Sequence, residues 1–338
     1  MAQLRWGIVS AGKISHDFTT ALATWPKEQH LAVAISARKL ADAEQFAKKH
    51  GLAKAYEGYE ALAKDAEIDA VYIGAINPAH YEIGRLMLDH GKHVLCEKPL
   101  CINEGQSKRL LAHAQAKKLF FMEAIWSRFF PSYIQLRDRI NAGELGDIQQ
   151  VDVSFGFPLA DVDRLRMKQL GGGTVLDLGV YTIQVILWAF RAAPTKIVAK
   201  GKLNEDGVDL EVSAELHFAN GGIARMKTSA LEKQTNTATV RGSKGTMTLH
   251  DFWCPLALTD IDGSRKEYTL PEGARHPFNF QNSCGLRYEA EEVRQCIAGG
   301  RLESASVPHS ESLLIARIQD EIRRQIGVQF PEDAEFKV

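Results

Sequence analysis

Residues 4–15, LRWGIVSAGKIS, contain the pattern that decides the fold of the N-terminal part of the chain. The apolar run from 4 to 9 is typical of a short buried strand, and a helical pattern begins at Lys13. The small residues 10–12 lie between them, so the segment predicts a strand, a tight turn and a helix in direct succession. Such a turn lets backbone N–H groups at the helix N-terminus approach a phosphate group.

The same alternation of strand and helix signals continues to about residue 123. Short apolar strands are expected at residues 4–9, 31–36, 70–74, 93–96 and 119–122, and helices at 13–24, 40–49, 79–90 and 104–117. Buried strands that alternate with helices predict an α/β fold with a doubly wound parallel sheet. Residues 1–123 are therefore expected to form a Rossmann domain.

A different pattern follows in residues 124–338. Between 209 and 218 the apolar residues Leu210, Val212, Ala214, Leu216 and Phe218 alternate with polar ones. This alternation is typical of an antiparallel strand with one solvated face. A Gly-Gly pair at 221–222 predicts a hairpin turn into a strand at 223–229. With a strand at 151–157 and helices at 286–297 and 310–326, the pattern predicts an α+β domain on a large, mainly antiparallel, open-faced sheet.

Composition excludes several classes of protein. The 338 residues are 45% apolar and 25% charged, with a net charge of -1, so no general basic field exists to bind nucleic acid or an anionic membrane. No apolar stretch approaches the roughly 18 residues of a membrane span, and no signal peptide is visible. The cysteines number five and include no C-x-x-C pair. A reducing, cytoplasmic location without disulfides is expected.

The end of the second expected strand indicates which dinucleotide would bind. Enzymes that use NAD usually carry an acidic residue there, which binds the ribose hydroxyls. This chain instead has Ser36, Arg38 and Lys39 at that place. A hydroxyl group and cations suit the 2′-phosphate of NADP. The alternative interpretation is that Arg38 and Lys39 are solvated loop charges.

Two further motifs carry candidate chemistry. Lys98 follows the strand at 93–96, and ligands bind at the carboxyl ends of such strands; the alternative is a surface ion pair with Glu97. Asp177 and Tyr181 follow a glycine run and are four residues apart, so they share a helix face. A carboxylate and a phenol there are suited to holding and deprotonating a hydroxyl group. The alternatives are that Asp177 completes a capping box with Thr174 and that Tyr181 belongs to the core.

Aromatic residues mark a candidate substrate pocket, although aromatic residues belong to the core more often than to a site. The residues expected to line it are Trp126, Arg128, Phe155, Trp253 and Phe280. His50, His80 and His93 stand apart from other possible ligands in the sequence, so no metal site is expected.

Three motifs in order, around Gly12, around Lys98-Pro99 and at residues 172–181, resemble the glucose–fructose oxidoreductase/inositol dehydrogenase family over nearly the whole chain. Residues 122–131, 252–255 and 326–331 resemble a narrower, dimeric branch of that family whose members use NADP. Departures from the family pattern are Ser10 in place of glycine and Ser15 in place of glycine or alanine. Both are small residues.

The resemblance implies a role for each candidate residue. Lys98 corresponds to the catalytic lysine, Tyr181 to the acid–base residue of the narrower branch, and Asp177 to the active-site acid. In the expected mechanism Tyr181 removes the hydroxyl proton, and Lys98 stabilises the tyrosinate, because a nearby cation favours the charged phenol. The residues expected to bind the cofactor are Ser10, Ala11, Gly12, Lys13, Ile14, Ser36, Arg38, Asn77, Glu97 and Lys98.

The activity implied is NADP-dependent oxidation of vicinal diols by hydride transfer. The expected reactions are trans-1,2-dihydrobenzene-1,2-diol to catechol, D-xylose to xylonolactone, or both, in a homodimer that pairs its open sheets. Two alternatives remain: another NADP-dependent sugar or polyol oxidoreductase, and a regulator that senses the nucleotide without turnover. A zinc alcohol dehydrogenase is disfavoured because its ligand clusters are missing from the sequence.

Overall fold

The computed structural model describes residues 3–336, and its internal contacts divide the chain into two compact units. The first unit comprises Met1–Cys101, Gln106–Trp126 and Leu270–Ser312, and the second comprises Ile102–Gly105, Ser127–Thr269 and Leu313–Val338. The expected division into residues 1–123 and 124–338 places the segment Leu270–Ser312 in the C-terminal domain. In the structure this segment belongs to the first unit.

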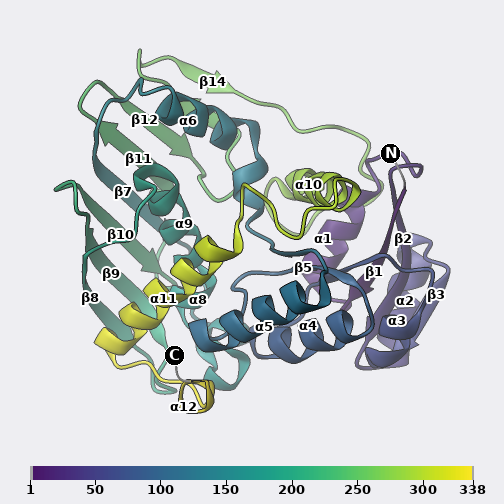
Figure 1. The fold of residues 1–338 in the computed structure, drawn as a ribbon. Helices are drawn as coiled ribbons and strands as arrows, with labels where there is room; N and C mark the ends of the chain where they lie inside the picture. Colours follow the sequence, from purple (N-terminus) through teal and green to yellow (C-terminus); the bar gives the residue numbers. More distant parts are fainter. Residues whose placement is uncertain (1–2, 337–338) are drawn as a thin grey trace. The chain divides into compact units, whose positions relative to one another are not determined.

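The first unit is built on a six-stranded sheet in the order β3-β2-β1-β4-β5-β6 (Figure 1). All of its strand pairs are parallel. Its strands are β1 (Leu4–Val9), β2 (His30–Ala37), β3 (Lys54–Glu57), β4 (Ala70–Ile73), β5 (His93–Cys96) and β6 (Phe121–Glu123). The order reverses at β1, as a doubly wound sheet requires. The expected Rossmann sheet is confirmed, with β3 as an additional strand that the sequence pattern did not predict.

Helices connect these strands or come from the late segment Leu270–Ser312. They are α1 (Lys13–Leu22), α2 (Leu40–His50), α3 (Glu60–Lys64), η1 (Asn77–Ala79), α4 (His80–Asp89), α5 (Glu104–Lys117), η2 (Trp126–Phe129), η4 (Ser283–Gly285) and α10 (Leu286–Ala298). The helix α10 comes from the late segment of the chain and lies beside α1. Strands β4 and β5 are almost completely buried, because a parallel sheet is covered on both faces.

The second unit is built on an eight-stranded sheet in the order β14-β13-β12-β11-β7-β10-β9-β8. Its strands are β7 (Ile148–Gly156), β8 (Lys196–Leu203), β9 (Asp209–His217), β10 (Ile223–Ser229), β11 (Thr237–Gly242), β12 (Thr246–His250), β13 (Ala257–Thr259) and β14 (Arg265–Glu267). Every pair is antiparallel except β7 with β10, which is parallel. The expected large, mainly antiparallel sheet is confirmed.

Helices pack on one face of this sheet, and the other face is polar. The helices of the unit are α6 (Pro131–Asn141), α7 (Asp163–Arg166), η3 (Lys168–Leu170), α8 (Thr174–Asp177), α9 (Gly179–Phe190), α11 (His309–Ile326) and α12 (Glu332–Glu335). Helix α9 packs against β7, β10 and β11. Along β9 the apolar residues Val212 and Leu216 are buried, whereas Ser213 is exposed. On the polar face Arg225 donates to Glu215 at 3.1 Å across the strands.

One apolar run departs from the expectation that no stretch approaches a membrane span. Residues Lys168–Phe190, which include α8 and α9, are long and apolar enough by length and composition to cross a membrane, but 94% of the most apolar window is buried inside the protein. Burial on all sides explains the apolar composition, because a helix that is hydrophobic all round is typical of a core. The five cysteines are also buried, and all are free thiols.

Candidate active site

The turn between β1 and α1 has the geometry of a phosphate-binding turn. Ser10 takes a positive φ of 79°, a conformation that glycine adopts more easily than serine. Gly12 is the N-cap of α1, and the first turn of that helix carries no acidic side chain. A Cβ added at Gly12 would come no closer than 3.5 Å to any protein atom outside its chain neighbours. Packing against the rest of the protein therefore does not by itself require glycine here.

Ser15 shows how the chain accommodates the departure from the family pattern. Its hydroxyl group is buried and donates to the carbonyl oxygen of Val9 at 3.4 Å. A Cβ added at Gly74, which follows β4, would lie only 2.3 Å from the Ser15 hydroxyl oxygen. The glycine that lets helix and sheet approach closely is therefore supplied by Gly74, and serine fits at position 15.

The end of β2 presents the residues expected to contact the adenosine half of a dinucleotide. Ser36 is fully buried, and its backbone carbonyl accepts from the N–H of Ser10 at 2.8 Å. Arg38 is exposed at the strand end, and Asp42 lies in the first turn of α2. Tyr59 was missed by the sequence analysis. Burial raises the pKa of Tyr59, and the positive charge of Arg38 opposes that rise, so the phenol lies within electrostatic reach of Arg38.

The loop that carries Lys98 is held by buried polar groups of the same unit. Glu97 accepts from the hydroxyl of Tyr72 at 2.6 Å and from the backbone N–H of Lys98 at 3.2 Å. His80 bonds to the carbonyl oxygen of Pro99 at 2.9 Å, and Glu123 accepts from the N–H of Leu100 at 2.9 Å. Glu97 is therefore buried and supports the loop through these hydrogen bonds.

The residues expected near the cofactor otherwise lie on turns at the carboxyl ends of strands. Lys13 and Ile14 begin α1, and Asn77 lies half-exposed in η1 after β4. His80 is fully buried and also bonds to the carbonyl oxygen of Ala75 at 3.0 Å. Burial lowers the pKa of His80. It connects the loop after β4 to the loop after β5.

In the second unit the helix that carries Asp177 is capped by a residue distant in sequence. Asp209, the first residue of β9, accepts from the hydroxyl of Thr174 at 2.7 Å and from the N–H of Val175 at 2.8 Å. Burial raises the pKa of Asp209, and these hydrogen bonds oppose the rise. Thr174 is the first residue of α8 and Gly173 is its N-cap. The cap is thus Asp209, and the interpretation of Asp177 as part of a capping box is wrong.

Because Asp209 provides the cap, the Asp177 carboxylate is not required to cap α8. This carboxylate pairs with the Nη1 atom of Arg164 at 2.6 Å. Tyr181 lies one helical turn later in α9 and is 6% exposed. Its ring meets the ring of Phe155 edge to face, with centroids 5.5 Å apart.

Phe155 connects the Tyr181 ring to further aromatic side chains within this unit. Phe155 stacks on Trp253 with ring centroids 4.8 Å apart, and Phe157 meets Trp253 edge to face at 5.4 Å. We call Phe155, Phe157, Tyr181 and Trp253 the aromatic wall. The structure thus brings together two of the expected pocket residues, Phe155 and Trp253, with the candidate acid–base residue.

The remaining expected pocket residues do not join the aromatic wall within one unit. Arg128 is fully buried, donates to the side chain of Gln184 at 3.0 Å and lies over the ring of Trp188. That environment is a structural one in the core of the second unit. Trp126 and Phe280 belong to the first unit. Phe280 is 43% exposed, and its backbone N–H donates to Asp17 at 2.9 Å.

The histidines correct one expectation. His50 is not isolated, because it bonds to His16 at 2.9 Å and its ring centroid lies 5.1 Å from that of His276. Burial and the neighbouring charges of His16, His276 and Lys49 lower the pKa of His50 to about 3. Among residues 3–336, no group of three or more potential ligands is arranged to hold a metal ion.

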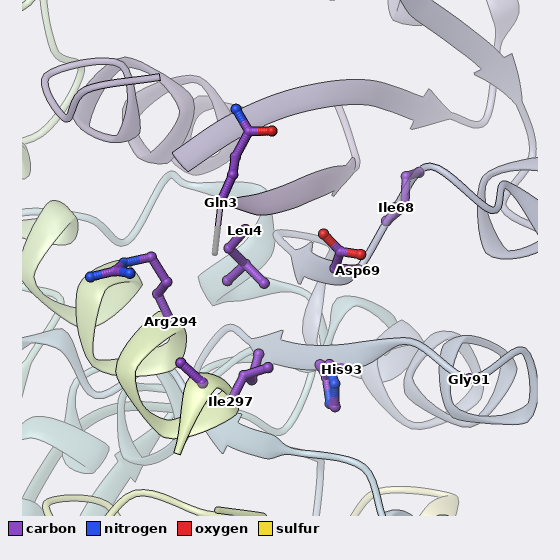
Figure 2. Close-up of a pocket in the computed structure, with 9 residues that line it drawn as sticks. Gln3, Leu4, Ile68, Asp69, Gly91, His93, Arg294 and Ile297 are labelled. Carbon is purple, nitrogen blue, oxygen red and sulfur yellow. The ribbon is translucent and has the colours of Figure 1, made fainter. Parts of the chain in front are cut away.

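A cavity of about 330 Å³ lies at the opposite end of the first sheet from the phosphate-binding turn (Figure 2). It is lined by Gln3, Leu4, Ile68, Asp69, Gly91, His93, Arg294, Ile297 and Ala298. Leu4 and His93 are the first residues of β1 and β5, so the cavity lies at the amino ends of strands. Ligands of doubly wound sheets bind at the carboxyl ends, and this cavity is therefore separate from the candidate cofactor site.

Comparison with known proteins identifies the family. Residues 4–124 match the model of the oxidoreductase family with an NAD-binding Rossmann fold, and residues 133–248 match the GFO/IDH/MocA C-terminal domain. The trans-1,2-dihydrobenzene-1,2-diol dehydrogenase of Danio rerio is 42% identical over 334 residues, which cover 98% of this chain and 99% of the relative. The enzyme of the same name from Bos taurus is 44% identical over 332 residues, with the same coverage.

Solved structures agree with this result. KijD10, a 3-ketoreductase from Actinomadura kijaniata in complex with NADP and TDP-benzene, is 26% identical, with a TM-score of 0.81 over 96% of this chain and 98% of that one. The aldose-aldose oxidoreductase from Caulobacter crescentus has a TM-score of 0.82 at 20% identity over 96% of this chain and 97% of its own, which shows a shared fold. The chain is an oxidoreductase of the GFO/IDH/MocA family with a nicotinamide-binding Rossmann domain.

Proposed function

We propose that the protein is an NADP-dependent dehydrogenase of vicinal diols. The proposed reaction is the oxidation of trans-1,2-dihydrobenzene-1,2-diol to catechol, with D-xylose as a second candidate substrate that would give xylonolactone. Relatives of 42–44% identity over nearly the full length carry the name of the first activity. Lys98 and Tyr181 are both present, which disfavours a regulator without turnover.

The observation that carries the proposal is the position of Tyr181 in the aromatic wall. A phenol that transfers a proton must lie beside the hydroxyl group of the substrate. Phe155 meets the Tyr181 ring edge to face with centroids 5.5 Å apart and stacks on Trp253 with centroids 4.8 Å apart, so flat apolar side chains pack beside the phenol ring. Such side chains suit a substrate with a flat ring, and the ring of a dihydrodiol fits this description better than an open-chain polyol. Sugar rings also offer an apolar face to aromatic side chains, which keeps D-xylose as the second candidate.

Each candidate residue has a defined task in the proposed reaction. Tyr181 accepts the hydroxyl proton, and Lys98 supplies the positive charge that favours the deprotonated oxygen. Asp177 is held in one orientation by Arg164 and positions the substrate. The nicotinamide cofactor, when bound, supplies the acceptor for the hydride. The assignment of Lys98 and Tyr181 to one step is supported by the order of the motifs along the chain and by the family resemblance.

Preference for NADP over NAD is supported by the end of β2. The exposed cation Arg38 lies where NAD enzymes usually carry an acidic residue. The turn at residues 10–12 and the acid-free first turn of α1 suit the diphosphate that both dinucleotides share. In this arrangement Arg38 would bind the 2′-phosphate, while Ser10, Ala11 and Gly12 would hold the diphosphate with their backbone N–H groups.

A substrate panel tests the proposal. Purified protein is incubated with NADP⁺ or NAD⁺ and with trans-dihydrodiols, D-xylose, other aldoses and simple alcohols, and the absorbance of the reduced cofactor is followed. We expect turnover of a vicinal diol with a higher kcat/KM for NADP⁺. Turnover of simple alcohols only, or binding of NADP⁺ without turnover of any compound, contradicts the proposed function.

We also propose that the protein forms a homodimer through the polar face of the eight-stranded sheet. This face carries outward-pointing charged and hydroxyl side chains on β7, β9, β10 and β11, among them Arg225 paired with Glu215. An obligate interface typically buries more than about 2,000 Å², and the eight strands offer a continuous sheet face for it. Sedimentation should show a dimer at micromolar concentration that shifts toward monomer in Arg225→Glu, and a wild-type monomer contradicts the proposal.

A further inference from the structure

Arg164 forms an ion pair with Asp177 at the end of α8, and no sequence motif indicated this pair. The two side chains approach to 2.6 Å between Nη1 and Oδ1, and the exposed fractions are 46% for Arg164 and 8% for Asp177. One partner is thus accessible to a ligand and the other is fixed in the protein. An ion pair with this asymmetry presents a donor group and an acceptor group side by side.

The fold fixes the position of Arg164 through its chain neighbours. The N–H of Gly173 donates to the carbonyl oxygen of Leu165 at 2.8 Å, and the N–H of Gly172 donates to that of Met167 at 3.1 Å. A Cβ added at Gly172 would lie 2.5 Å from the Leu165 oxygen. Only glycine allows this close approach, which binds the short helix α7 to the start of α8. The glycine run therefore places the backbone of α7, which carries Arg164, beside the start of α8.

The position of Asp177 is fixed from the other side. Asp209 caps α8 through the hydroxyl of Thr174 and the N–H of Val175. Tyr181 follows Asp177 by one helical turn and belongs to the aromatic wall. Asp177 of the charged pair thus lies at the end of α8, and Tyr181, the candidate proton carrier, lies in the first turn of α9.

We propose that Arg164 is a specificity-determining residue that, together with Asp177, binds the hydroxyl group next to the one that is oxidised. A hydroxyl group has one hydrogen to donate and two lone pairs to accept. It can donate to the carboxylate of Asp177 and accept from the guanidinium of Arg164 at the same time, and both hydrogen bonds are charge-assisted. This inference rests on the proposed function and identifies which residue makes the enzyme select a diol over a simple alcohol.

The experiment compares a substrate with its analogue that lacks the neighbouring hydroxyl group. Suitable pairs are D-xylose with 2-deoxy-D-xylose and trans-cyclohexane-1,2-diol with cyclohexanol. Arg164→Met should lower kcat/KM for the diol by roughly 10- to 100-fold, the loss expected for one charge-assisted hydrogen bond. For the deoxy analogue kcat/KM should fall clearly less than for the diol, because Arg164 has no hydroxyl to bind there and only the orientation of Asp177 is affected.

A matched control lies on the same short helix. Arg166 is exposed and pairs with Asp163 at 2.7 Å. The variant Arg166→Met makes the same chemical change two residues away and should leave the preference for the diol unchanged. Arg164→Ala should regain part of its activity with the diol when guanidinium chloride is added, and Arg164→Lys should keep part of it.

The outcomes separate this inference from the proposed function. A wild-type protein that turns over no diol or sugar overturns both. Wild-type turnover with an equal loss for the diol and its deoxy analogue in Arg164→Met overturns this inference alone and assigns Arg164 a general structural role. If Arg166→Met loses as much kcat/KM for the diol as Arg164→Met, this inference is also overturned. A loss in Arg164→Met that is selective for the diol, together with rescue of Arg164→Ala by guanidinium, supports the inference.

Discussion

The two sheets of the protein place functional residues by different means. In the six-stranded parallel sheet the strands are short and buried, as in Ala70–Ile73 and His93–Cys96, and the candidate residues lie in the loops that follow them. In the eight-stranded sheet the strands are longer and half-exposed, as in Asp209–His217. There the candidate residues lie on helices that cover one face, and the other face stays polar.

This difference follows from the hydrogen bonding and burial of each kind of sheet. A parallel sheet is covered on both faces, so only its strand ends are open to a ligand. An antiparallel sheet can bury one face and leave the other to solvent or a partner. The first sheet is therefore suited to binding a dinucleotide at the carboxyl ends of its strands. The second sheet is suited to supporting a substrate site on one face and an interface on the other.

The largest expected effect tests whether the two sheets supply separate parts of one reaction. Tyr181→Phe keeps the ring in the aromatic wall and removes only the hydroxyl group, so kcat should fall by roughly 10²- to 10⁴-fold. The Kd of NADP⁺ should stay unchanged, because the phosphate-binding turn belongs to the first unit. Lys98→Met should lower kcat at least as much. Near-normal kcat in Tyr181→Phe would assign the phenol a structural role.

Whether Lys98 and Tyr181 serve the same step is measured by the double variant. Residues that act as one unit show losses that do not add. The double variant should therefore be about as slow as the slower single variant. Losses that multiply would show that the two residues act in separate steps.

A smaller effect, on the choice of cofactor, is expected at the carboxyl end of β2 in the first sheet. Arg38→Asp removes a charge-assisted contact with the 2′-phosphate, worth roughly 1.5–3 kcal/mol. The ratio of kcat/KM for NADP⁺ to that for NAD⁺ should therefore fall by roughly 10- to 150-fold. Lys48→Asp makes a similar change at the exposed far end of α2, the helix that follows Arg38, and should leave the ratio unchanged. Equal use of both cofactors by the wild type would contradict the assignment.

Substitution of Asp209 tests how much its cap on α8 stabilises the second unit. Asp209→Ala leaves the buried hydroxyl of Thr174 and the N–H of Val175 without this acceptor, which should lower the free energy of unfolding by about 1–3 kcal/mol. Asp209→Asn keeps one acceptor oxygen and should lose less. Urea unfolding measures both variants, and kcat should fall in the same order. Equal losses in the two variants would show that the acceptor oxygen is not what matters.

The smallest effect concerns the histidine cluster of the first unit. The pKa of His50 is about 3 in the folded protein, below its ordinary value of 6.5. The unfolded chain thus binds a proton more readily, so the stability that His50 contributes is complete above pH 6.5 and is lost as the pH falls toward 3. His50→Gln should flatten the fall in Tm between pH 7 and pH 4. Parallel curves for wild type and variant would exclude His50 as the cause.

The features that the sequence predicted correctly are local ones. The run from Leu4 to Lys13 contains a strand, a turn and a helix start within a few residues, and the alternation in β9 repeats every two residues. The parallel pairing of β7 with β10 was missed because nothing in either strand encodes its partner.

The features that the sequence did not predict depend mainly on contacts between residues distant in the chain. Asp209 caps a helix that lies 35 residues earlier, and His16 meets a histidine 34 residues later. Asp17 accepts from backbone N–H groups of residues 279 and 280. The partner of Asp177 was missed although it is close in sequence, because the turn at Gly172 that brings Arg164 back has no signature other than glycine. Side-chain partners of this kind depend on the folded topology.

The cap formed by Asp209 also sets the order in which activity can appear during refolding. Helix α8 has only four residues, and a helix of that length has little stability of its own. Its acceptor comes from β9, so the loop between Thr174 and Asp209 must close before the helix is held. Asp177 therefore takes its place only once strand β9 has docked. Recovery of enzyme activity should thus lag behind formation of the eight-stranded sheet and never precede it.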